Sequence, residues 1–387
     1  MNRESDYIYL DNHATTPIAS QVVEAMLPFF YTHFGNASSD SILGETARKA
    51  ISYSRESIAS LMGANSDEIF YTSGATESLN WGIKGLCTAK SNKKHIITSS
   101  IEHSSILKVC DYLELVGYSI TRINPDTNGI LSIELINNAI RTDTLCIAIA
   151  HANNEIGTIQ PIEAIGKLCK ERDIYFIVDA AQTFGKIKID VKKMGIHLLA
   201  VSGHKLYAPK GIGCLFIDKI AQKKIVPLIS GGGQEFGFRS GTENVPYIVG
   251  LGKAAEICLS VMEQEQVNIL NMRQKLLENL QKGLDKIVIN GCLENRLAAN
   301  LNISFIGVPS DVFIKNIGNI IVAKGSACTS LRKSYSHVLQ AISNQEDIMS
   351  SAIRIGIGRY NTMEEIEYVS NKIINTVNTI IKSNGDF

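Results

Sequence analysis

The sequence has no excess charge of either sign, with 38 lysines and arginines against 38 aspartates and glutamates in 387 residues. A chain without net charge creates no field that would draw it to nucleic acid or to an anionic membrane. We therefore expect no direct nucleic-acid binding and no membrane binding. No run of about 18 apolar residues is present, and residues 1–11 lack the apolar stretch of a signal peptide. A cytoplasmic protein is the expectation.

The eight cysteines show no CxxC spacing and no clustering, so we predict neither a disulfide framework nor a metal site. Most of them occur within apolar segments, as Cys146 does, which is typical of buried thiols in a reducing compartment. Cys328 differs because it lies among small residues in Lys324-Gly-Ser-Ala-Cys-Thr-Ser330. We interpret Cys328 as a candidate reactive thiol; an inert thiol is the alternative as long as no cofactor lies nearby.

Short apolar segments alternate with amphipathic stretches through the first two thirds of the chain. The predicted strands there are 68–71, 95–98, 118–122, 144–149, 175–178, 198–201 and 213–217. Buried strands separated by helices indicate a mostly parallel sheet covered on both faces. Beyond it we expect a long helix over 245–281, strands at 287–289, 300–304 and 320–322, and a final helix from 362. The prediction is an α/β fold with a large domain over residues 17–255 and a smaller α+β domain formed by residues 1–16 and 256–387.

Two charged residues follow apolar strands near the middle of the chain. Lys205 ends the segment Ser202-Gly-His-Lys205, and Asp179 follows the strand 175–178. A lysine in a dry site loses its proton more easily and becomes a nucleophile toward an aldehyde. A buried carboxylate needs a cationic partner, for which the protonated ring nitrogen of a pyridine cofactor is suited. The alternatives are a solvated lysine and an aspartate that caps the next helix. Both strand ends would face one crevice at the carboxyl edge of the sheet.

A third strand end opens a helix with the residues Thr72-Ser-Gly-Ala75-Thr76-Glu-Ser78. Small residues, a hydroxyl and free backbone N–H groups at a helix start suit a phosphate, so Ala75 and Thr76 are candidate ligands. A capped helix that binds nothing is the alternative. Ser202 and His204 would add phosphate donors from the other side of the crevice.

Three further residues suit a cofactor or substrate but are indecisive singly. His103 follows the strand 95–98 and could stack on a planar ring and move protons. Asn154 also follows a strand, and its amide could bind a phenolic oxygen or a carboxylate. Arg354 alternates with apolar residues in a predicted strand, where its guanidinium is suited to bind a carboxylate through two hydrogen bonds.

Taken in order, these segments resemble the successive motifs of the cysteine desulfurases, which are enzymes of the class V aminotransferase superfamily with pyridoxal 5'-phosphate (PLP) as cofactor. The matching segments are Leu10-Asp-Asn-His-Ala-Thr-Thr-Pro17, Thr72–Ser78, Ile101-Glu-His103, Asn153-Asn-Glu-Ile-Gly157, Asp179-Ala-Ala-Gln182, Ser202–Lys205, Arg239-Ser-Gly-Thr242 and Gly325-Ser-Ala-Cys-Thr-Ser330. The resemblance runs from about residue 8 to 366. It implies a fold-type I PLP-dependent transferase whose small domain carries the active cysteine.

The resemblance also implies a role for each matching residue. Lys205 would form the internal aldimine with PLP, and Asp179 would pair with the pyridinium nitrogen. Gln182, with Asn154 nearby, would hydrogen-bond the phenolic oxygen, and His103 would stack on the ring and assist proton transfer. The implied phosphate ligands are Ala75, Thr76, Ser202 and His204, joined by Thr242 and Arg239 from the partner subunit of a homodimer. Arg354 and Asn154 would bind the carboxylate of L-cysteine.

The implied reaction converts L-cysteine to L-alanine through a PLP aldimine. The catalytic residues would be Lys205, His103 and Cys328, whose thiolate would take the sulfur as a persulfide. The persulfide would then pass to an acceptor protein that serves tRNA thiolation, DNA phosphorothioation or iron–sulfur clusters.

Three departures from the family pattern bear on that acceptor. Ala37 and Ser41 stand where members usually carry Pro and His, Leu331-Arg-Lys333 is more basic than usual, and the chain ends soon after its last helix. We hypothesise a dedicated sulfur donor for tRNA thiolation or DNA phosphorothioation, with iron–sulfur cluster assembly as the alternative. Two rival functions are a selenocysteine lyase or another PLP enzyme of the same fold, which would not need Cys328, and a catalytically inactive interaction subunit.

Overall fold

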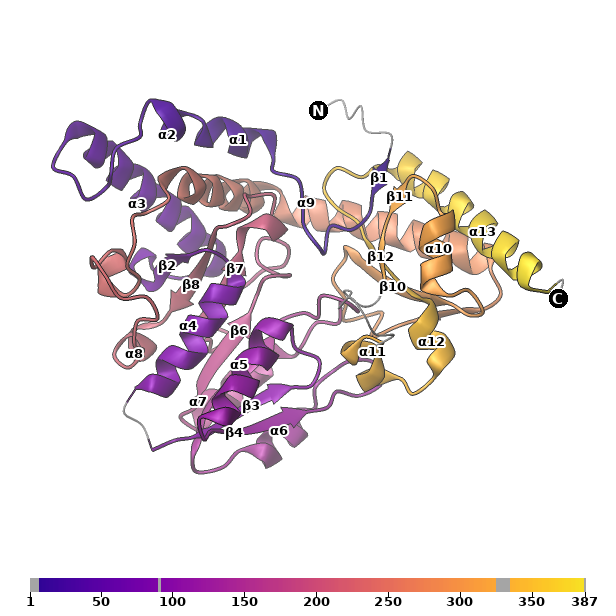
Figure 1. The fold of residues 1–387 in the computed structure, drawn as a ribbon, viewed down its shortest axis with the longest axis horizontal. Helices are drawn as coiled ribbons and strands as arrows, with labels where there is room; N and C mark the ends of the chain where they lie inside the picture. Colours follow the sequence, from indigo (N-terminus) through magenta and orange to yellow (C-terminus); the bar gives the residue numbers. More distant parts are fainter. Residues whose placement is uncertain (1–6, 90–91, 325–334, 386–387) are drawn as a thin grey trace.

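A seven-stranded sheet forms the centre of the computed structural model, which describes residues 7–89, 92–324 and 335–385 (Figure 1). In the order β2-β8-β7-β6-β5-β3-β4, its strands are β2 (Ile69–Thr72), β8 (Gly213–Ile217), β7 (Leu198–Ser202), β6 (Tyr175–Asp179), β5 (Thr144–Ala150), β3 (His95–Ser99) and β4 (Ser119–Ile123). Of these seven, β8 runs antiparallel to both of its neighbours, and the other pairs are parallel. The predicted strands and the mostly parallel sheet are confirmed.

Most strands have largely apolar sequences because both faces of the sheet are buried, whereas the edge strand β4 is partly exposed. In β5, Ile147 and Ile149 pack into one core, whereas Cys146 and Ala148 pack into another on the opposite face. Side chains alternate across a strand, so two buried faces require apolar residues at every position. Thr144 to Ile149 are accordingly all buried.

Helices cover both faces of this sheet and produce three layers. One face packs against α1 (Ser20–Met26), α3 (Ile42–Met62), α6 (Ile133–Ala139), α7 (Ile162–Glu171) and the first part of α9 (Val245–Gly283). The other face packs against α4 (Ala75–Thr88), α5 (Ser104–Leu115) and α8 (Lys219–Gln222). The short helix α2 (Pro28–Tyr31) connects α1 with the loop before α3.

The helix α9 is long enough to take part in two cores (Figure 1). Val245 to Cys258 contribute to the core of the large sheet, whereas Ile269 to Leu280 contribute to a separate core. By length and composition α9 is the one helix within the described residues that could cross a membrane, yet 44% of its most apolar window is buried in the fold. Both ends of the helix pack into cores, whereas Leu259 and Val267 between them are exposed.

The second core lies against a small antiparallel sheet in the order β12-β13-β10-β9. The strands of this sheet are β12 (Ala323–Lys324), β13 (Ala352–Gly356), β10 (Asn300–Phe305) and β9 (Ile287–Ile289). The helices of this part of the chain are α10 (Ser310–Asn316), α11 (His337–Ile342), α12 (Glu346–Ser351) and α13 (Met363–Gly385). The short strand β1 (Ile8–Tyr9) pairs with β11 (Ile320–Ile321), so the start of the chain joins this part. The exact division at residue 255 stays a prediction.

Candidate active site

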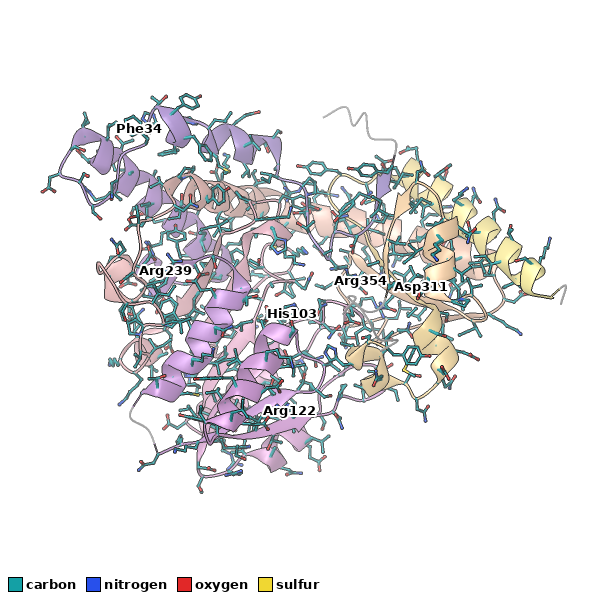
Figure 2. The ribbon with its side chains drawn as sticks, viewed as in Figure 1. Phe34, His103, Arg122, Arg239, Asp311 and Arg354 are labelled. Carbon is teal, nitrogen blue, oxygen red and sulfur yellow. The ribbon has the colours of Figure 1, made fainter. Side chains whose placement is uncertain are left out.

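A cavity of about 550 Å³ lies at the carboxyl edge of the large sheet, where β5, β6 and β7 end. Its lining includes every site residue that the sequence suggested within the described ranges except Thr242 and Arg239. These residues are Ala75, Thr76, His103, Asn154, Asp179, Gln182, Ser202, His204, Lys205 and Arg354. Figure 2 shows His103, from the large sheet, and Arg354, from the small sheet, close together in the middle of the molecule. Cys328 and residues 331–333 lie outside the described residues.

Lys205 ends the short helical turn that follows β7 and is half-buried. Its Nζ donates hydrogen bonds to the carbonyl oxygens of His13 and Ala14, the latter at 2.7 Å. Burial lowers the pKa of Lys205 from 10.5 to about 7, and the positive charges of Lys186 and Arg354 act in the same direction. A large fraction of this amine is therefore neutral near pH 7, as a nucleophile toward an aldehyde must be.

Asp179 is the last residue of β6, and its side chain is buried. One carboxylate oxygen accepts a hydrogen bond from the Ala181 N–H at 2.9 Å. Burial raises the pKa of Asp179, and the nearby His103 and Lys205 oppose that effect. A buried carboxylate without an ion-pair partner is costly, so this position favours a cationic group in the cavity.

His103 caps the start of α5, and its ring is open to the cavity. Its Nδ1 accepts a hydrogen bond from the backbone N–H of Ser105 at 3.1 Å, which places the ring proton of the neutral form on Nε2. The surrounding protein desolvates the ring and lowers the pKa of His103, although Asp179 raises it. The neutral imidazole therefore carries its proton on Nε2, which has no hydrogen-bond partner among the described residues, and the ring lines the cavity.

The start of α4 supplies a candidate anion site on another wall of the cavity. Gly74 precedes the helix with φ 151°, and Ala75 and Thr76 begin it. Ser202 and His204 line the same cavity, and the Nδ1 of His204 lies 3.1 Å from the Thr15 hydroxyl. Burial lowers the pKa of His204 to about 4, with Lys205 and Lys210 adding to the effect. Helix N–H groups, a hydroxyl and an imidazole are donors that suit a phosphate.

Thr242 and Arg239 are not part of this cavity. Thr242 lines a separate cavity with Tyr71 and Glu235. The Arg239 Nε pairs with the Glu77 carboxylate of its own chain at 2.9 Å. Neither residue therefore reaches the cofactor cavity of its own chain.

Arg354 lies on β13 and connects the small sheet to the cavity. Its Nη2 pairs with the Asp11 carboxylate at 2.7 Å, and its Nη1 donates to the Asn154 carbonyl oxygen at 3.0 Å. Its Nε is buried and has no hydrogen-bond partner among the described residues. An unpaired donor on a guanidinium fits an incoming carboxylate. Asp11 stands in the first of the matching motifs, whose sequence alone indicated no role for this carboxylate.

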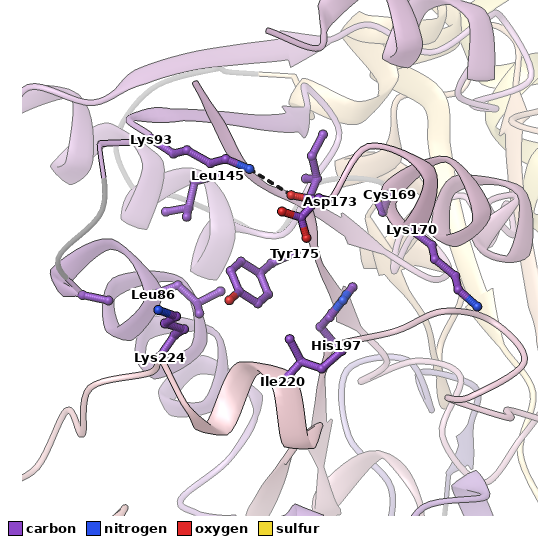
Figure 3. Close-up of a pocket in the computed structure, with 12 residues that line it drawn as sticks. Leu86, Lys93, Leu145, Cys169, Lys170, Asp173, Tyr175, His197, Ile220 and Lys224 are labelled. Atoms are coloured by element: carbon purple, nitrogen blue, oxygen red, sulfur yellow. Dashed lines mark hydrogen bonds between the residues drawn. The ribbon is translucent and has the colours of Figure 1, made fainter. Parts of the chain in front are cut away.

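A second cavity of about 340 Å³ lies at the opposite, amino edge of the same sheet (Figure 3). It is lined by Leu145 near the start of β5, by Tyr175 at the start of β6 and by His197 just before β7. Lys93 donates to the backbone oxygen of Asp173 across it, at 2.9 Å. Active sites of open α/β sheets lie at the carboxyl edge, so the larger cavity is the candidate active site.

Seven of the eight cysteines lie within the described residues, and six of these are buried. Burial raises the pKa of Cys87, Cys110 and Cys169 to about 12. Such thiols are inert as nucleophiles near neutral pH. The prediction that most cysteines are buried is confirmed, and the partly exposed Cys292 is the exception.

Comparison with known proteins identifies the family. The Aminotransferase class-V family profile matches residues 8–369. A cysteine desulfurase IscS of Ehrlichia chaffeensis is 46% identical over 372 residues, which are 96% of this chain and 91% of that protein. The chain belongs to the cysteine desulfurase family. Cysteine desulfurases of this class depend on PLP, so this chain is a PLP-dependent enzyme.

Solved structures support the same assignment. A structure described as a NifS-like protein is 35% identical, with a TM-score of 0.90, and the match covers 96% of this chain and all of that one. A structure of SspA in complex with cysteine is 40% identical, with a TM-score of 0.81 over 92% of this chain and 99% of that one. The predicted fold-type I architecture is confirmed.

The residues of the cavity fit PLP. Lys205 offers a largely neutral amine, Asp179 an unpaired buried carboxylate, and the start of α4 a set of phosphate donors. These groups lie on different walls of one cavity. The individual roles of the residues stay predictions.

Proposed function

We propose that this desulfurase takes its sulfur from L-cysteine, releases L-alanine and passes the sulfur through Cys328 to an acceptor protein. The observation that carries the proposal is the position of Arg354, which lines the cavity that contains Lys205. A guanidinium next to a reactive lysine suits an α-amino acid, because the carboxylate binds one group while the amine faces the other. The SspA structure with bound cysteine supports this substrate class.

Five side chains would hold the cofactor and the substrate. Lys205 would bind the PLP aldehyde, Asp179 the ring nitrogen, Gln182 the phenolic oxygen, and Arg354 with Asn154 the substrate carboxylate. PLP supplies an electron sink that weakens the bonds at the substrate α-carbon. Asp179 favours that sink because its carboxylate keeps the ring nitrogen protonated.

The proton transfers would be handled by Lys205 and His103. With a pKa of about 7, the Lys205 amine can accept the substrate α-proton and later return a proton. The Nε2–H of the neutral His103 faces the cavity and can donate to the substrate. Burial lowers the pKa of Lys205 to about 7, so this amine exchanges protons near neutral pH, whereas the lowered pKa of His103 keeps its imidazole neutral there.

The sulfur step needs an accessible thiolate, which we assign to Cys328. Its sulfur would attack the sulfur of the substrate, so that a sulfur–sulfur bond forms as the carbon–sulfur bond breaks. The electron pair stays with the substrate carbon, which takes up a proton and becomes the methyl group of alanine. The product on the protein is a Cys328 persulfide, ready for transfer to another thiol.

A homodimer would complete the phosphate site. Thr242 does not reach the cavity of its own chain, which supports its donation to the cavity of a second copy. Arg239 is held by Glu77 of its own chain, so we assign the role to Thr242 alone. In a dimer, Thr242→Ala lowers the affinity for PLP without dissociating the subunits. An unchanged affinity, or a monomer by light scattering, would contradict this assignment.

The acceptor is proposed to be a protein thiol in the cytoplasm. Iron–sulfur cluster assembly and nucleic-acid modification are the two routes. Ser41, one of the departures from the family pattern, caps α3 by accepting a hydrogen bond from the Gly44 N–H, and Ala37 is buried. These two departures therefore have structural roles.

The two routes are distinguished by mixing persulfide-labelled enzyme with a cluster scaffold and, separately, with a tRNA- or DNA-modifying protein. The protein that takes up the label identifies the route.

The central test is mass spectrometry of the protein after incubation with L-cysteine. We expect a 32 Da addition, one sulfur atom, on Cys328 in the native protein. Cys328→Ala abolishes both the persulfide and alanine release, whereas the matched control Cys292→Ala retains both. If Cys328→Ala releases sulfur at the native rate, the rival reading of a selenocysteine lyase or another PLP enzyme is correct.

A further inference from the structure

His13 and Gln182 bind each other at the wall of the cofactor cavity, although 169 residues separate them in the sequence. The His13 Nδ1 lies 3.0 Å from the Gln182 Oε1, and the Gln182 Nε2 donates to the His13 carbonyl oxygen at 3.1 Å. The two side chains are 1% and 6% exposed. One residue therefore binds both ends of the Gln182 amide.

Elementary hydrogen-bond chemistry determines the orientation of this amide. A backbone carbonyl oxygen only accepts, so the group that faces it must be the Nε2 of Gln182. The other end is then Oε1, which also only accepts, so the His13 Nδ1 must carry a proton. In the reversed orientation two acceptors would face each other across a buried contact.

The remaining nitrogen of the ring shows that His13 stays neutral. Its Nε2 is buried and has no partner among the described residues. A second ring proton would therefore be an N–H without an acceptor. Burial, followed by the positive charges of Lys186 and Arg354, holds the pKa of His13 well below its usual 6.5. The Nδ1–H donor is accordingly present throughout the neutral pH range.

We propose that His13 is a positioning residue, whose Nδ1–H holds the Gln182 amide so that an N–H, and not the carbonyl, is offered to the phenolic oxygen of PLP. The inference rests on the proposed function, which assigns Gln182 to that oxygen. The Gln182 Nε2 carries two hydrogens, of which the His13 carbonyl takes one and leaves one for the cofactor. A reversed amide would present an oxygen to an anionic oxygen.

The consequence is a defined spectroscopic property. A hydrogen bond donated to the phenolic oxygen stabilises the deprotonated form of the chromophore that PLP makes with Lys205. The bond therefore lowers the pH midpoint of the visible absorbance. Loss of a hydrogen bond to a charged group shifts such a midpoint by about one pH unit. If His13 had only a structural role, its replacement would change the stability of the protein and leave the midpoint of the titration unchanged.

The test is a pH titration of the visible absorbance of the PLP-loaded protein. His13→Leu removes the donor, and we expect its midpoint to rise by about one unit. His13→Asn keeps an N–H near the position of Nδ1, and we expect the native midpoint. If His13→Leu does not fold, His13→Ala removes the same donor and is titrated in its place.

Two further variants test whether His13 acts on the cofactor only through Gln182. Gln182→Leu is expected to raise the midpoint as His13→Leu does, and the double variant to match Gln182→Leu alone, because His13 acts only through Gln182. The matched control is His95→Leu, a buried histidine that hydrogen-bonds Thr121 and Thr144 at the amino edge of the same sheet. It is expected to lower thermal stability and keep the native midpoint.

The possible outcomes are distinguishable. A native midpoint in His13→Leu with PLP bound would overturn the inference, as would shifts that add in the double variant. If the native protein with PLP has no visible absorbance, the proposed function fails as well. The inference is supported if His13→Leu raises the midpoint, His13→Asn keeps the native midpoint, and adding His13→Leu to Gln182→Leu raises it no further.

Discussion

The Arg354 Nη2 lies 2.7 Å from the Asp11 carboxylate, so a residue of the small sheet is held by the segment that follows β1. The same guanidinium donates to the Asn154 carbonyl oxygen from the large sheet. Three segments, 143 or more residues apart, therefore determine the position of one cationic group. Within the described residues the Nε of this guanidinium is buried and has no partner, so the bonds of Nη1 and Nη2 hold the group at the wall of the cavity.

Arg354→Lys is expected to raise KM for L-cysteine about tenfold or more, because a lysine cannot bind a carboxylate and Asp11 in the same forked geometry. PLP content is expected to stay native, since Arg354 is proposed to contact the substrate only. Steady-state kinetics with an absorbance measurement of bound PLP provides the check. A native KM would contradict the assignment of the carboxylate site.

Asp11→Asn removes the charge that pairs with Arg354 and keeps the shape of the side chain. We expect a smaller rise in KM than for Arg354→Lys, because the guanidinium is still present but less firmly held. In the double variant the two effects are not additive, since the residues are in contact. Additive effects would show that Asp11 acts independently of Arg354.

The rate at which PLP binds to the apo-protein is expected to rise with pH, with a midpoint near 7. The reason is that burial lowers the pKa of Lys205 to about 7, so the amine is protonated and unreactive below that pH and neutral above it. Stopped-flow absorbance over a pH series measures the midpoint. Lys186→Met removes the positive charge that lowers the pKa of Lys205 most, so the midpoint is expected to move upward. A midpoint near 10 would contradict the burial of the amine.

Asp179→Asn is expected to lower kcat at least a hundredfold while PLP stays bound to Lys205. A neutral amide cannot keep the ring nitrogen protonated, so the electron sink weakens. Single-turnover alanine formation, with the absorbance of bound cofactor as control, measures the effect. Asp173→Asn, an exposed aspartate at the opposite edge of the sheet, is the matched control and is expected to keep native kcat.

Glu235→Gln is expected to lower the free energy of unfolding by about 3–5 kcal/mol, because it leaves the buried Arg55 charge without its partner. The Arg55 Nη2 lies 2.7 Å from the Glu235 carboxylate, and the two side chains are 8% and 4% exposed. The same carboxylate accepts a hydrogen bond from the Tyr71 N–H at 2.8 Å. Urea denaturation of the native and variant proteins gives the difference. A double variant, Arg55→Met with Glu235→Leu, is expected to cost less than Glu235→Gln alone.

The ion pair also explains an unusual stretch of backbone. Glu235 and Phe236 have φ values of 50° and 57°, a region that residues other than glycine rarely adopt. The bonds of Glu235 to Arg55 and Tyr71 hold the turn in this conformation, and the Arg55 guanidinium stacks on Phe236. A strained turn of this kind persists only where the surroundings determine it.

The sequence predicted the elements that depend on local chemistry. Most strands of the large sheet have largely apolar sequences because both faces are buried, whereas the edge strand β4 is partly exposed. Asp179 is the last residue of β6, and Lys205 ends the short turn after β7. Parallel strands end at one edge, so their common location followed from the pattern. The motifs around Ser202–Lys205 and Asp179–Gln182 were sufficient to indicate the family.

Pairings between distant segments did not follow from the sequence. Asp11 binds Arg354 across 343 residues, and His13 binds Gln182 across 169. A short polar motif near the start of a chain resembles any capped turn, and its partners are known only once the chain has folded. The motif containing Asp11 and His13 was a signal for these residues, yet it specified neither role.

The amino-acid sequence by itself determined the sheet, its helical covering and the family to which the enzyme belongs, because local apolar periodicity and contiguous motifs specify these features. The tertiary structure decided how the site is assembled. The low pKa of Lys205, the unpaired Nε of Arg354 and the orientation of the Gln182 amide arise from desolvation and from contacts between segments far apart in the chain. Such properties depend on the groups that surround a residue in space, and the order of residues in the chain does not specify these surroundings directly.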